Sequence, residues 1–342
     1  MRRIPSIVVA ISATTALIFV ALFYSDMHYS SLKTMSNVPE QAFRMMQPIM
    51  PQEYSDLTTK KLYLKTMVVF LSGYVFKDDP LKMGVGAAVK TQGTYKDQVR
   101  RTGGDWPSIG FTMIGTEGLE NIQQLLEDVF KQQVQGDFLE AGVWRGGASI
   151  FAKAVITIYD EKNRHVWVCD SFQGLPSATQ NKDTDRWSKM NALEVSKETV
   201  RNNFNEVFLL DSSVHFQQGY FVYSLPCLRQ KFKNSGTKLA VLRADGDMYE
   251  SLMDILFNLY EFVPVGGYVI IDDWTIDVAK KAVNEFRKMF GINEQIHEFR
   301  GMSCFWKVTR IIKIDYQWYK DFLNTRSLDR SKMNCNNVID FE

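Results

Sequence analysis

Three aspartates stand where two predicted strands end, and their type and spacing are those of a cation site. Asp245 follows the apolar run 239–244, and the pair Asp272 and Asp273 follows the run 267–271. Carboxylate oxygens are the ligands that Mg²⁺ and similar hard cations prefer. A single acid in such a place could simply cap the helix after its strand. Because adjacent acids at one sheet edge repel each other unless a cation lies between them, the sequence predicts a metal site here.

Glu140 marks a second site with different chemistry. It ends a short apolar strand, and a turn with Gly142, Gly146 and Gly147 leads from it into a helix. Strand, glycine-rich turn and helix open the ligand site of doubly wound α/β folds. The glycines do not follow the G-x-G-x-x-G spacing, and no Walker lysine-serine pair is present. An acid that faces the crevice suits a ligand with positive charge or hydroxyls, and S-adenosylmethionine carries both.

Asp170 follows Glu140 by about the length of one strand-helix-strand unit. It ends the apolar run 165–169, and the turn 171–176 comes directly after it. In doubly wound folds an acid at this strand end binds the hydroxyls of a ribose. The same residue could equally cap the turn that follows, and the sequence leaves both roles open.

The elements that would position these acids alternate regularly along the chain. Apolar runs of strand length alternate with segments of helical periodicity from residue 137 to about residue 290. This alternation predicts an α/β fold with a doubly wound, mostly parallel sheet. Two further short runs, 296–299 and 303–308, predict a β pair that gives the sheet a mixed edge. The predicted strands of the parallel part are 137–140, 165–170, 214–219, 239–245 and 266–274.

The N-terminal segment predicts a membrane anchor. Residues 4–25 contain no charged side chain and are mostly apolar, which is the length of a membrane-spanning helix. Arg2 and Arg3 precede this run, so the N-terminus is expected in the cytosol and the rest of the chain across the membrane. A cleaved signal peptide followed by secretion is the main alternative, and a soluble helix is another.

Composition narrows the remaining possibilities. The 342 residues are 45% apolar and 23% charged, which is ordinary for a globular protein. A formal charge of +1 gives no general attraction for nucleic acid, so no nucleic-acid partner is expected. The four cysteines are widely spaced and predict neither a zinc site nor a disulfide framework. Cys169, Cys227 and Cys304 lie in apolar runs and are expected to be small core residues.

The sequence resembles the macrocin O-methyltransferase family. The resemblance extends over about residues 62–308, and its motifs appear in the family's order. The matching pieces are Asp-Trp-Pro at 105–107, Thr-Met-Ile-Gly at 112–115, Gly-Asp-Phe-Leu-Glu-Ala-Gly-Val-Trp-Arg-Gly-Gly-Ala at 136–148, Asp-Ser-Phe-Gln-Gly-Leu-Pro at 170–176, Asp-Gly-Asp-Met-Tyr-Glu-Ser at 245–251, and Gly-Gly-Tyr-Val-Ile-Ile-Asp-Asp at 266–273.

The resemblance implies a class I fold that binds S-adenosylmethionine and Mg²⁺. Glu140 and the glycine turn would hold the methionine part of the cofactor, and Asp170 would bind its ribose. Ser171 and Phe172 would lie near the adenine, and residues 112–114 would cover the cofactor. Asp245, Asp272 and Asp273 would hold the Mg²⁺. The implied cofactor residues are Thr112, Met113, Ile114, Glu140, Gly142, Gly146, Gly147, Ser149, Asp170, Ser171, Phe172, Gln218 and Gly219.

The sequence also predicts a domain plan, in which the anchor and stem have no counterpart in the bacterial enzymes of this family. Residues 80–106 and 177–190 are irregular and are predicted to form loops over the site, with a packed connector as the alternative for the first of them. The expected segments are a cytosolic N-terminus (1–3), a transmembrane signal anchor (4–25), a stem or linker (26–57), a helical cap and lid (58–115), the methyltransferase domain (116–312) and a C-terminal tail (313–342).

The predicted reaction is methyl transfer to a hydroxyl of a sugar, a glycan or a glycosylated small molecule. A divalent metal would orient the acceptor, and Asp245 or Glu194 would remove the proton. Two alternatives stay open: another group-transfer or nucleotide-sugar enzyme on the same fold, and a membrane-anchored binding protein without catalysis. With the anchor in place, the protein would be a type II membrane protein with a lumenal catalytic domain in the Golgi or endoplasmic reticulum. A homo-oligomer is left open.

Overall fold

The computed structural model describes residues 59–81, 93–159, 161–179, 188, 190–333 and 335. The predicted anchor (4–25) and stem (26–57) lie outside the described residues and stay predictions. Parts of the two predicted loops, 82–92 and 180–187, also lie outside them. Among the residues that the structure describes, no helix is long and apolar enough to cross a membrane.

A seven-stranded sheet forms the centre of the fold, in the order β3-β2-β1-β4-β5-β7-β6. The first five strands in this order pair in parallel, and β7 runs antiparallel to both β5 and β6. The structure therefore confirms the predicted mostly parallel sheet with a mixed edge. The strands are β1 (Asp137–Ala141), β2 (Val166–Asp170), β3 (Val214–Gln218), β4 (Leu239–Ala244), β5 (Tyr268–Ile271), β6 (His297–Phe299) and β7 (Ser303–Lys307).

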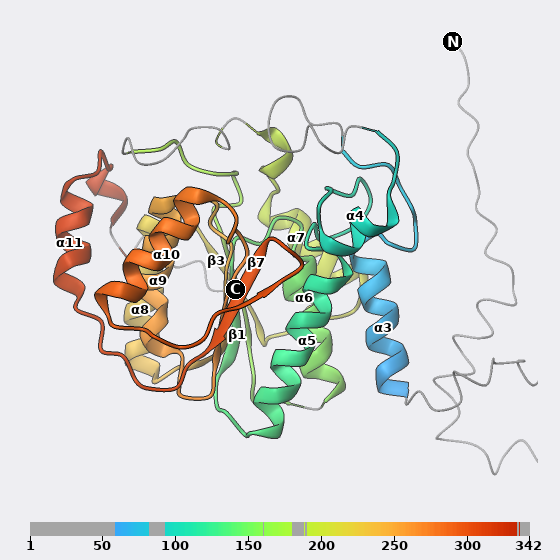
Figure 1. The fold of residues 1–342 in the computed structure, drawn as a ribbon, viewed down its shortest axis with the longest axis horizontal. Helices are drawn as coiled ribbons and strands as arrows, with labels where there is room; N and C mark the ends of the chain where they lie inside the picture. Colours follow the sequence, from blue (N-terminus) through green and yellow to red (C-terminus); the bar gives the residue numbers. More distant parts are fainter. Residues whose placement is uncertain are drawn as a thin grey trace, which may run out of the picture. The chain divides into compact units, whose positions relative to one another are not determined.

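Helices cover both faces of this sheet, as Figure 1 shows. One face packs against α8 to α11, and the other packs against α3, α5, α6 and α7, so two apolar cores form. The α-helices are α3 (Thr59–Leu71), α4 (Asp97–Thr102), α5 (Gly115–Lys131), α6 (Gly147–Ile158), α7 (Lys197–Glu206), α8 (Phe221–Ser235), α9 (Tyr249–Leu259), α10 (Asp277–Met289) and α11 (Tyr316–Asn324). The short 3₁₀ helices are η4 (Asn191–Leu193), η5 (Tyr260–Phe262) and η6 (Arg330–Met333).

Gly142 lets the ends of β1 and β4 come together. Its φ is +92°, and a Cβ atom at this position would lie 1.9 Å from the carbonyl oxygen of Asp245. Just before it, the backbone N–H of Asp245 donates to the carbonyl of Ala141 at 2.8 Å. Only glycine fits both the positive φ and this close approach. The turn after Glu140 is therefore fixed against the strand end that carries Asp245.

Two expectations about the C-terminal third need correction. Cys227 on α8 forms a disulfide with Cys335, whereas the sequence indicated no disulfide; Cys169 and Cys304 are free and buried, as predicted. The bonded cysteines are 108 residues apart in sequence, so no local spacing could reveal the pair. The segment expected as a tail also contains α11, which buries Tyr319 and its neighbours against the core.

Candidate active site

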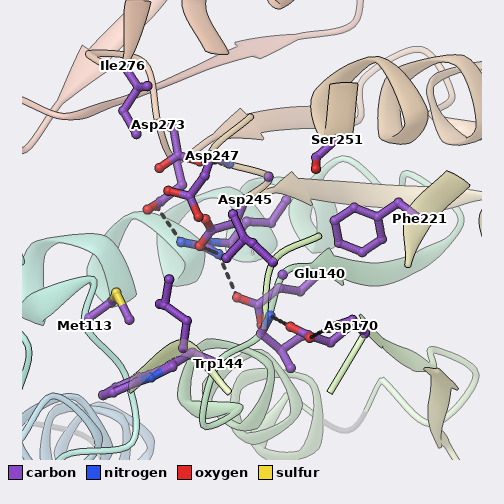
Figure 2. Close-up of a pocket in the computed structure, with 18 of the residues that line it drawn as sticks. Met113, Glu140, Trp144, Asp170, Phe221, Asp245, Asp247, Ser251, Asp273 and Ile276 are labelled. Atoms are coloured by element: carbon purple, nitrogen blue, oxygen red, sulfur yellow. Dashed lines mark hydrogen bonds and ion pairs between the residues drawn. The ribbon is translucent and has the colours of Figure 1, made fainter. Parts of the chain in front are cut away.

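A cavity of about 300 Å³ opens at the carboxyl end of the parallel strands. Figure 2 shows Asp245, Asp247 and Asp273 gathered in it, with Glu140 and Asp170 on one side and Ile276 on the opposite side. The strand ends of β1, β2, β4 and β5 all contribute carboxylates to its lining. Ligands of doubly wound folds bind at this edge, next to the point where the strand order reverses.

Arg243 links the acids of three strand ends. Its guanidinium pairs through Nη1 with Glu140 Oε1 at 2.7 Å and with Asp245 Oδ2 at 2.9 Å, and through Nη2 with Asp272 Oδ1 at 2.5 Å. The residue is only 1% exposed. Burial opposes its charge, but these three acids raise the pKa of Arg243 above its usual value. The sequence did not reveal this residue, because it lies inside a run that is otherwise apolar.

The acids around Arg243 differ in how they ionise. Burial raises the pKa of Glu140 to about 7, and burial together with the charge of Asp272 raises the pKa of Asp245 to about 6. Burial also opposes ionisation of Asp272, but Arg243 and a second guanidinium, that of Arg300, lower its pKa to about 2. Arg300 bonds directly to Asp272 and reaches the carbonyl of Thr102 at 3.2 Å. Asp272 is therefore the most acidic of the three carboxyl groups that pair with Arg243.

Asp247 and Asp273 lie beside this network without a cationic partner. Among the described residues, no lysine or arginine forms an ion pair with either carboxylate. The backbone N–H of Asp247 donates to Asp273 Oδ2 at 2.8 Å, and Asp247 itself has a φ of +54°. Burial, followed by the charges of Asp245 and Asp272, raises the pKa of Asp247 to about 8, and burial raises the pKa of Asp273 well above its usual value.

One group of oxygens in the described part of the chain could hold a metal ion. One carboxylate oxygen from each of Asp245, Asp272 and Asp273 lies within 4.8 Å of the others. Asp272 and Asp245 share Arg243, but Asp273 has no such neutralising charge. A set of three carboxylates supplies the oxygen ligands that a hard divalent cation prefers. The donor set thus fits the metal that the sequence predicted there.

The other end of the cavity holds Asp170. Its Oδ2 accepts from the backbone N–H of Val143 and its Oδ1 from that of Phe172, both at 2.8 Å. Burial raises the pKa of Asp170 in spite of these bonds. The Ser171 hydroxyl donates to the same Oδ1 over a longer distance of 3.4 Å, and Asp170 lines the cavity. It thereby both fixes the turn after β1 and faces the cavity.

The sequence profile of the macrocin-O-methyltransferase (TylF) family matches residues 67–308. The chain belongs to this family. The demethyldecarbamoylnovobiocin O-methyltransferase of Streptomyces niveus is 39% identical over 271 residues, which are 78% of this chain and 100% of that protein. The 8-demethyl-8-(2,3-dimethoxy-alpha-L-rhamnosyl)-tetracenomycin-C 4'-O-methyltransferase of Streptomyces olivaceus is 39% identical over 255 residues, 73% of this chain and 94% of that protein.

A solved structure supports the same membership. The O-methyltransferase NovP has a TM-score of 0.66 and 40% sequence identity, and the match covers 73% of this chain and 100% of that one. The chain is therefore an S-adenosylmethionine-dependent O-methyltransferase with the class I fold.

The structure brings about half of the predicted cofactor residues to the cavity surface. Those that line it are Thr112, Met113, Ile114, Glu140, Gly142, Asp170 and Ser171. Trp144 and Tyr220, which the sequence did not single out, line it as well. The indole N–H of Trp144 donates to the carbonyl of Ala192 at 2.9 Å, which fixes this ring at the cavity wall. Its φ of +48° is the one backbone signal that marks it.

The other predicted residues act from behind the surface or lie elsewhere. Ser149 donates to Glu140 from the first turn of α6, and the N–H of Gly147 bonds to the carbonyl of Phe111 at 2.9 Å. Phe172 is buried against Phe216. Glu194, the second predicted base, lies against Gly174 and is not among the lining residues. The remaining predicted residues that do not line the cavity are Gly146, Gln218 and Gly219.

Replacing Arg243 should destabilise the protein far more than replacing an exposed ion-pair partner. Arg243→Met leaves three carboxylates without their shared cation, so we expect the free energy of unfolding to fall by roughly 3–5 kcal/mol. Lys307→Met is the control, because Lys307 and Asp128 form a pair that is one third exposed. That change should cost about 1 kcal/mol or less. Urea unfolding followed by circular dichroism measures both, and equal losses would contradict the assigned role of Arg243.

Proposed function

We propose that this enzyme transfers the methyl group of S-adenosylmethionine to a hydroxyl of a sugar, a glycan or a glycosylated small molecule. The observation that carries the proposal is the cavity itself, which joins the Glu140 and Asp170 end to the group Asp245, Asp272 and Asp273. A carboxylate group with surplus negative charge attracts a cation, and a cation in turn binds hydroxyl oxygens. The rhamnosyl compound in the name of the Streptomyces olivaceus relative agrees with a sugar acceptor.

We infer that Asp245, Asp272 and Asp273 hold a divalent cation, with Mg²⁺ as the expected ion. Such an ion, when bound, makes a coordinated hydroxyl easier to deprotonate and fixes its direction. The chain keeps the three carboxylates ready for it. Arg243 and Arg300 fix Asp272, Arg243 fixes Asp245, and Asp273 keeps an oxygen within reach of both.

Asp247 is the best placed group to take the proton from the acceptor hydroxyl. It lines the cavity and its backbone is tied to Asp273, so its position relative to the metal group is fixed. Asp245 already gives one oxygen to Arg243, and Glu194 does not reach the cavity. With S-adenosylmethionine and the acceptor bound, the Asp247 carboxylate would receive the proton of the hydroxyl as its oxygen bonds to the methyl carbon. The carbon–sulfur bond would break, its electron pair would go to the sulfur, and S-adenosylhomocysteine would be released.

Alignment of the two reactants is the other contribution to the rate that we expect from this site. The turn after β1 is pressed against Asp245 by Gly142, so the cofactor end and the acid group cannot drift apart. Glu140 is held from two sides, by Ser149 and by Arg243, and so presents its carboxylate in one orientation. Holding two reactants in line converts a bimolecular step into an effectively unimolecular one. The described residues thus provide the alignment that methyl transfer needs.

We also propose that the catalytic part lies in an oxidising compartment, as a lumenal domain of a type II membrane protein would. The Cys227–Cys335 disulfide supports this location, since disulfides persist mainly in secreted proteins and in the secretory pathway. The predicted anchor at residues 4–25 agrees with it. Secretion after cleavage of that segment would satisfy the disulfide equally well.

The function is tested with the full chain, labelled S-adenosylmethionine, Mg²⁺ and a panel of methyl glycosides. We expect one glycoside to gain a methyl group in mass spectra, and we expect a chelator to abolish the transfer until Mg²⁺ is restored. Asp273→Asn should lose this activity, whereas Asp277→Asn, which removes an exposed acid four residues away, should keep it. Methylation that proceeds fully in excess chelator would refute the metal site. Absence of transfer to every glycoside, with binding of a nucleotide sugar instead, would refute the function.

The role of Asp247 is tested by Asp247→Asn. Loss of the base should lower kcat by roughly 10²–10⁴-fold. Calorimetric titration should show that S-adenosylmethionine still binds with nearly unchanged affinity, because Asp247 lies at the metal end of the cavity rather than at Asp170. The comparison enzyme is again Asp277→Asn. A kcat for Asp247→Asn that stays close to that of the unaltered chain would assign the base elsewhere.

The location is tested by expressing the tagged full chain in cultured animal cells. A C-terminal tag should be protected from protease in intact microsomes. Alkylation of the denatured, non-reduced protein should label Cys169 and Cys304 but leave Cys227 and Cys335 unlabelled. A tag that protease removes from intact microsomes, together with four reactive cysteines, would place the domain in the cytosol.

A further inference from the structure

The wall of the cavity beyond the acid group is built by α9 and by the C-terminal arm, which we define as residues 309–333 and Cys335. Ser251 and Asp254 on α9 line the cavity, and so does Arg326 on the arm. Ser251 and Asp254 are three residues apart, so they lie on the same face of the helix. Figure 2 shows Ser251 beyond Asp245 as seen from Glu140. The family profile ends at residue 308, before the arm begins.

Asp254 has one oxygen bound and one oxygen available. Its Oδ1 accepts from the hydroxyl of Tyr319 at 2.6 Å and from Arg326 Nη1 at 2.7 Å. Its Oδ2 accepts no hydrogen bond from the described residues, although Asp254 is only 2% exposed. Asp254 lines the cavity, so a donor group of a ligand bound there can reach this carboxylate without displacing a protein partner.

Arg326 holds this carboxylate in place. Its Nη2 pairs with Glu250 at 3.0 Å, its Nη1 with Asp254, and its Nε donates to Thr179 Oγ1 at 3.1 Å. Three directions of the planar guanidinium are thus occupied, so neither the arginine nor Asp254 can rotate freely. The arm positions Asp254 rather than merely covering it.

The arm itself is fastened on two sides. On one side α11 buries Tyr319, Phe322 and Leu323 in the core that includes α9. On the other side the disulfide joins Cys335 to α8, and the N–H of residue 329 donates to the hydroxyl of Tyr223 at 3.1 Å. The first residues of α8 also line the cavity, so the disulfide joins two parts of the same wall.

We propose that Asp254 and Ser251 form a second binding subsite for the acceptor, which binds a hydroxyl other than the one that is methylated, and that Tyr319 and Arg326 position it. The inference rests on the proposed function. A carboxylate oxygen only accepts, so it selects a partner with a donor, and a sugar carries several hydroxyl donors. An acceptor that lacks this second hydroxyl would not form the hydrogen bond to Asp254 and would bind more weakly.

The decisive experiment tests whether removing one substrate hydroxyl and removing the Asp254 carboxylate have non-additive effects on kcat/KM. It uses the full chain, the glycoside that the panel identifies, and the monodeoxy analogues of that glycoside. The unaltered enzyme should lose about tenfold or more in kcat/KM on one analogue whose methylated hydroxyl is intact. Asp254→Asn should lower kcat/KM for the parent glycoside by a similar factor. Its kcat/KM for that analogue should be only slightly lower still. Ser251→Ala, which removes only a hydroxyl, should give the same coupling in weaker form.

A matched pair of tyrosines separates positioning from general stability. Tyr319→Phe removes the bond to Asp254, and Tyr316→Phe removes the bond of 2.6 Å between Tyr316 and Asn258 on the same helix α9. Tyr319→Phe should raise the KM for the glycoside and leave the KM for S-adenosylmethionine unchanged, whereas Tyr316→Phe should change neither. Equal effects of the two changes would refute the positioning role.

Two outcomes would overturn the subsite, and they are distinguishable. If each analogue lowers kcat/KM, relative to the parent glycoside, by the same factor in the unaltered enzyme and in Asp254→Asn, then Asp254 does not bind the acceptor. The methyltransferase function would still stand. If the unaltered enzyme methylates no glycoside at all, the proposed function fails and the subsite fails with it.

Discussion

The guanidinium of Arg243 is the interaction on which the site depends. Buried carboxylates are stable only when they are paired, and Arg243 pairs with acids from the ends of β1, β4 and β5 at once. Without it, the ends of these three strands would carry like charges into one small volume. Arg300 adds one more guanidinium beside Asp272, and the whole cavity lining contains seven carboxylates but only three guanidiniums. Carboxylates therefore outnumber guanidiniums along the cavity wall.

The sheet order explains why these groups meet. In the order β3-β2-β1-β4-β5 the chain reverses direction between β1 and β4, and the loops after those strands leave toward opposite faces. A crevice forms at such a switch point. Gly142 then closes the distance between the two strand ends, so the cofactor turn and the acid of β4 are neighbours in space although 103 residues separate Glu140 from Arg243. Topology and one glycine together set the spacing between the turn after Glu140 and the carboxylates that follow β4.

The sequence predicted the parts of this arrangement that repeat along the chain. Apolar runs that end in acids located β1, β2, β4 and β5, and the parallel sheet then required their acids to converge. It did not reveal Arg243, because an arginine inside an apolar run carries no signal until its partners on other strands are known. It passed over Asp247 as part of a turn, since only its backbone angle and its bond to Asp273 distinguish it. The disulfide and the packing of α11 depend on contacts between distant segments, which local patterns do not contain.

The two buried charge clusters of the cavity follow the same physical rule. Around Arg243, the acids exceed the guanidiniums, and Asp273 has no cationic partner among the described residues. Around Arg326, Glu250 and Asp254 share one guanidinium, and one oxygen of Asp254 is left to accept a hydrogen bond. Each cluster fixes its carboxylates with arginine and keeps an acceptor free on the side that faces the cavity. A ligand with several hydroxyls can complete both clusters at once, which an acceptor with a single hydroxyl cannot do. The charge pattern thus favours a polyhydroxylated acceptor independently of any likeness to known proteins.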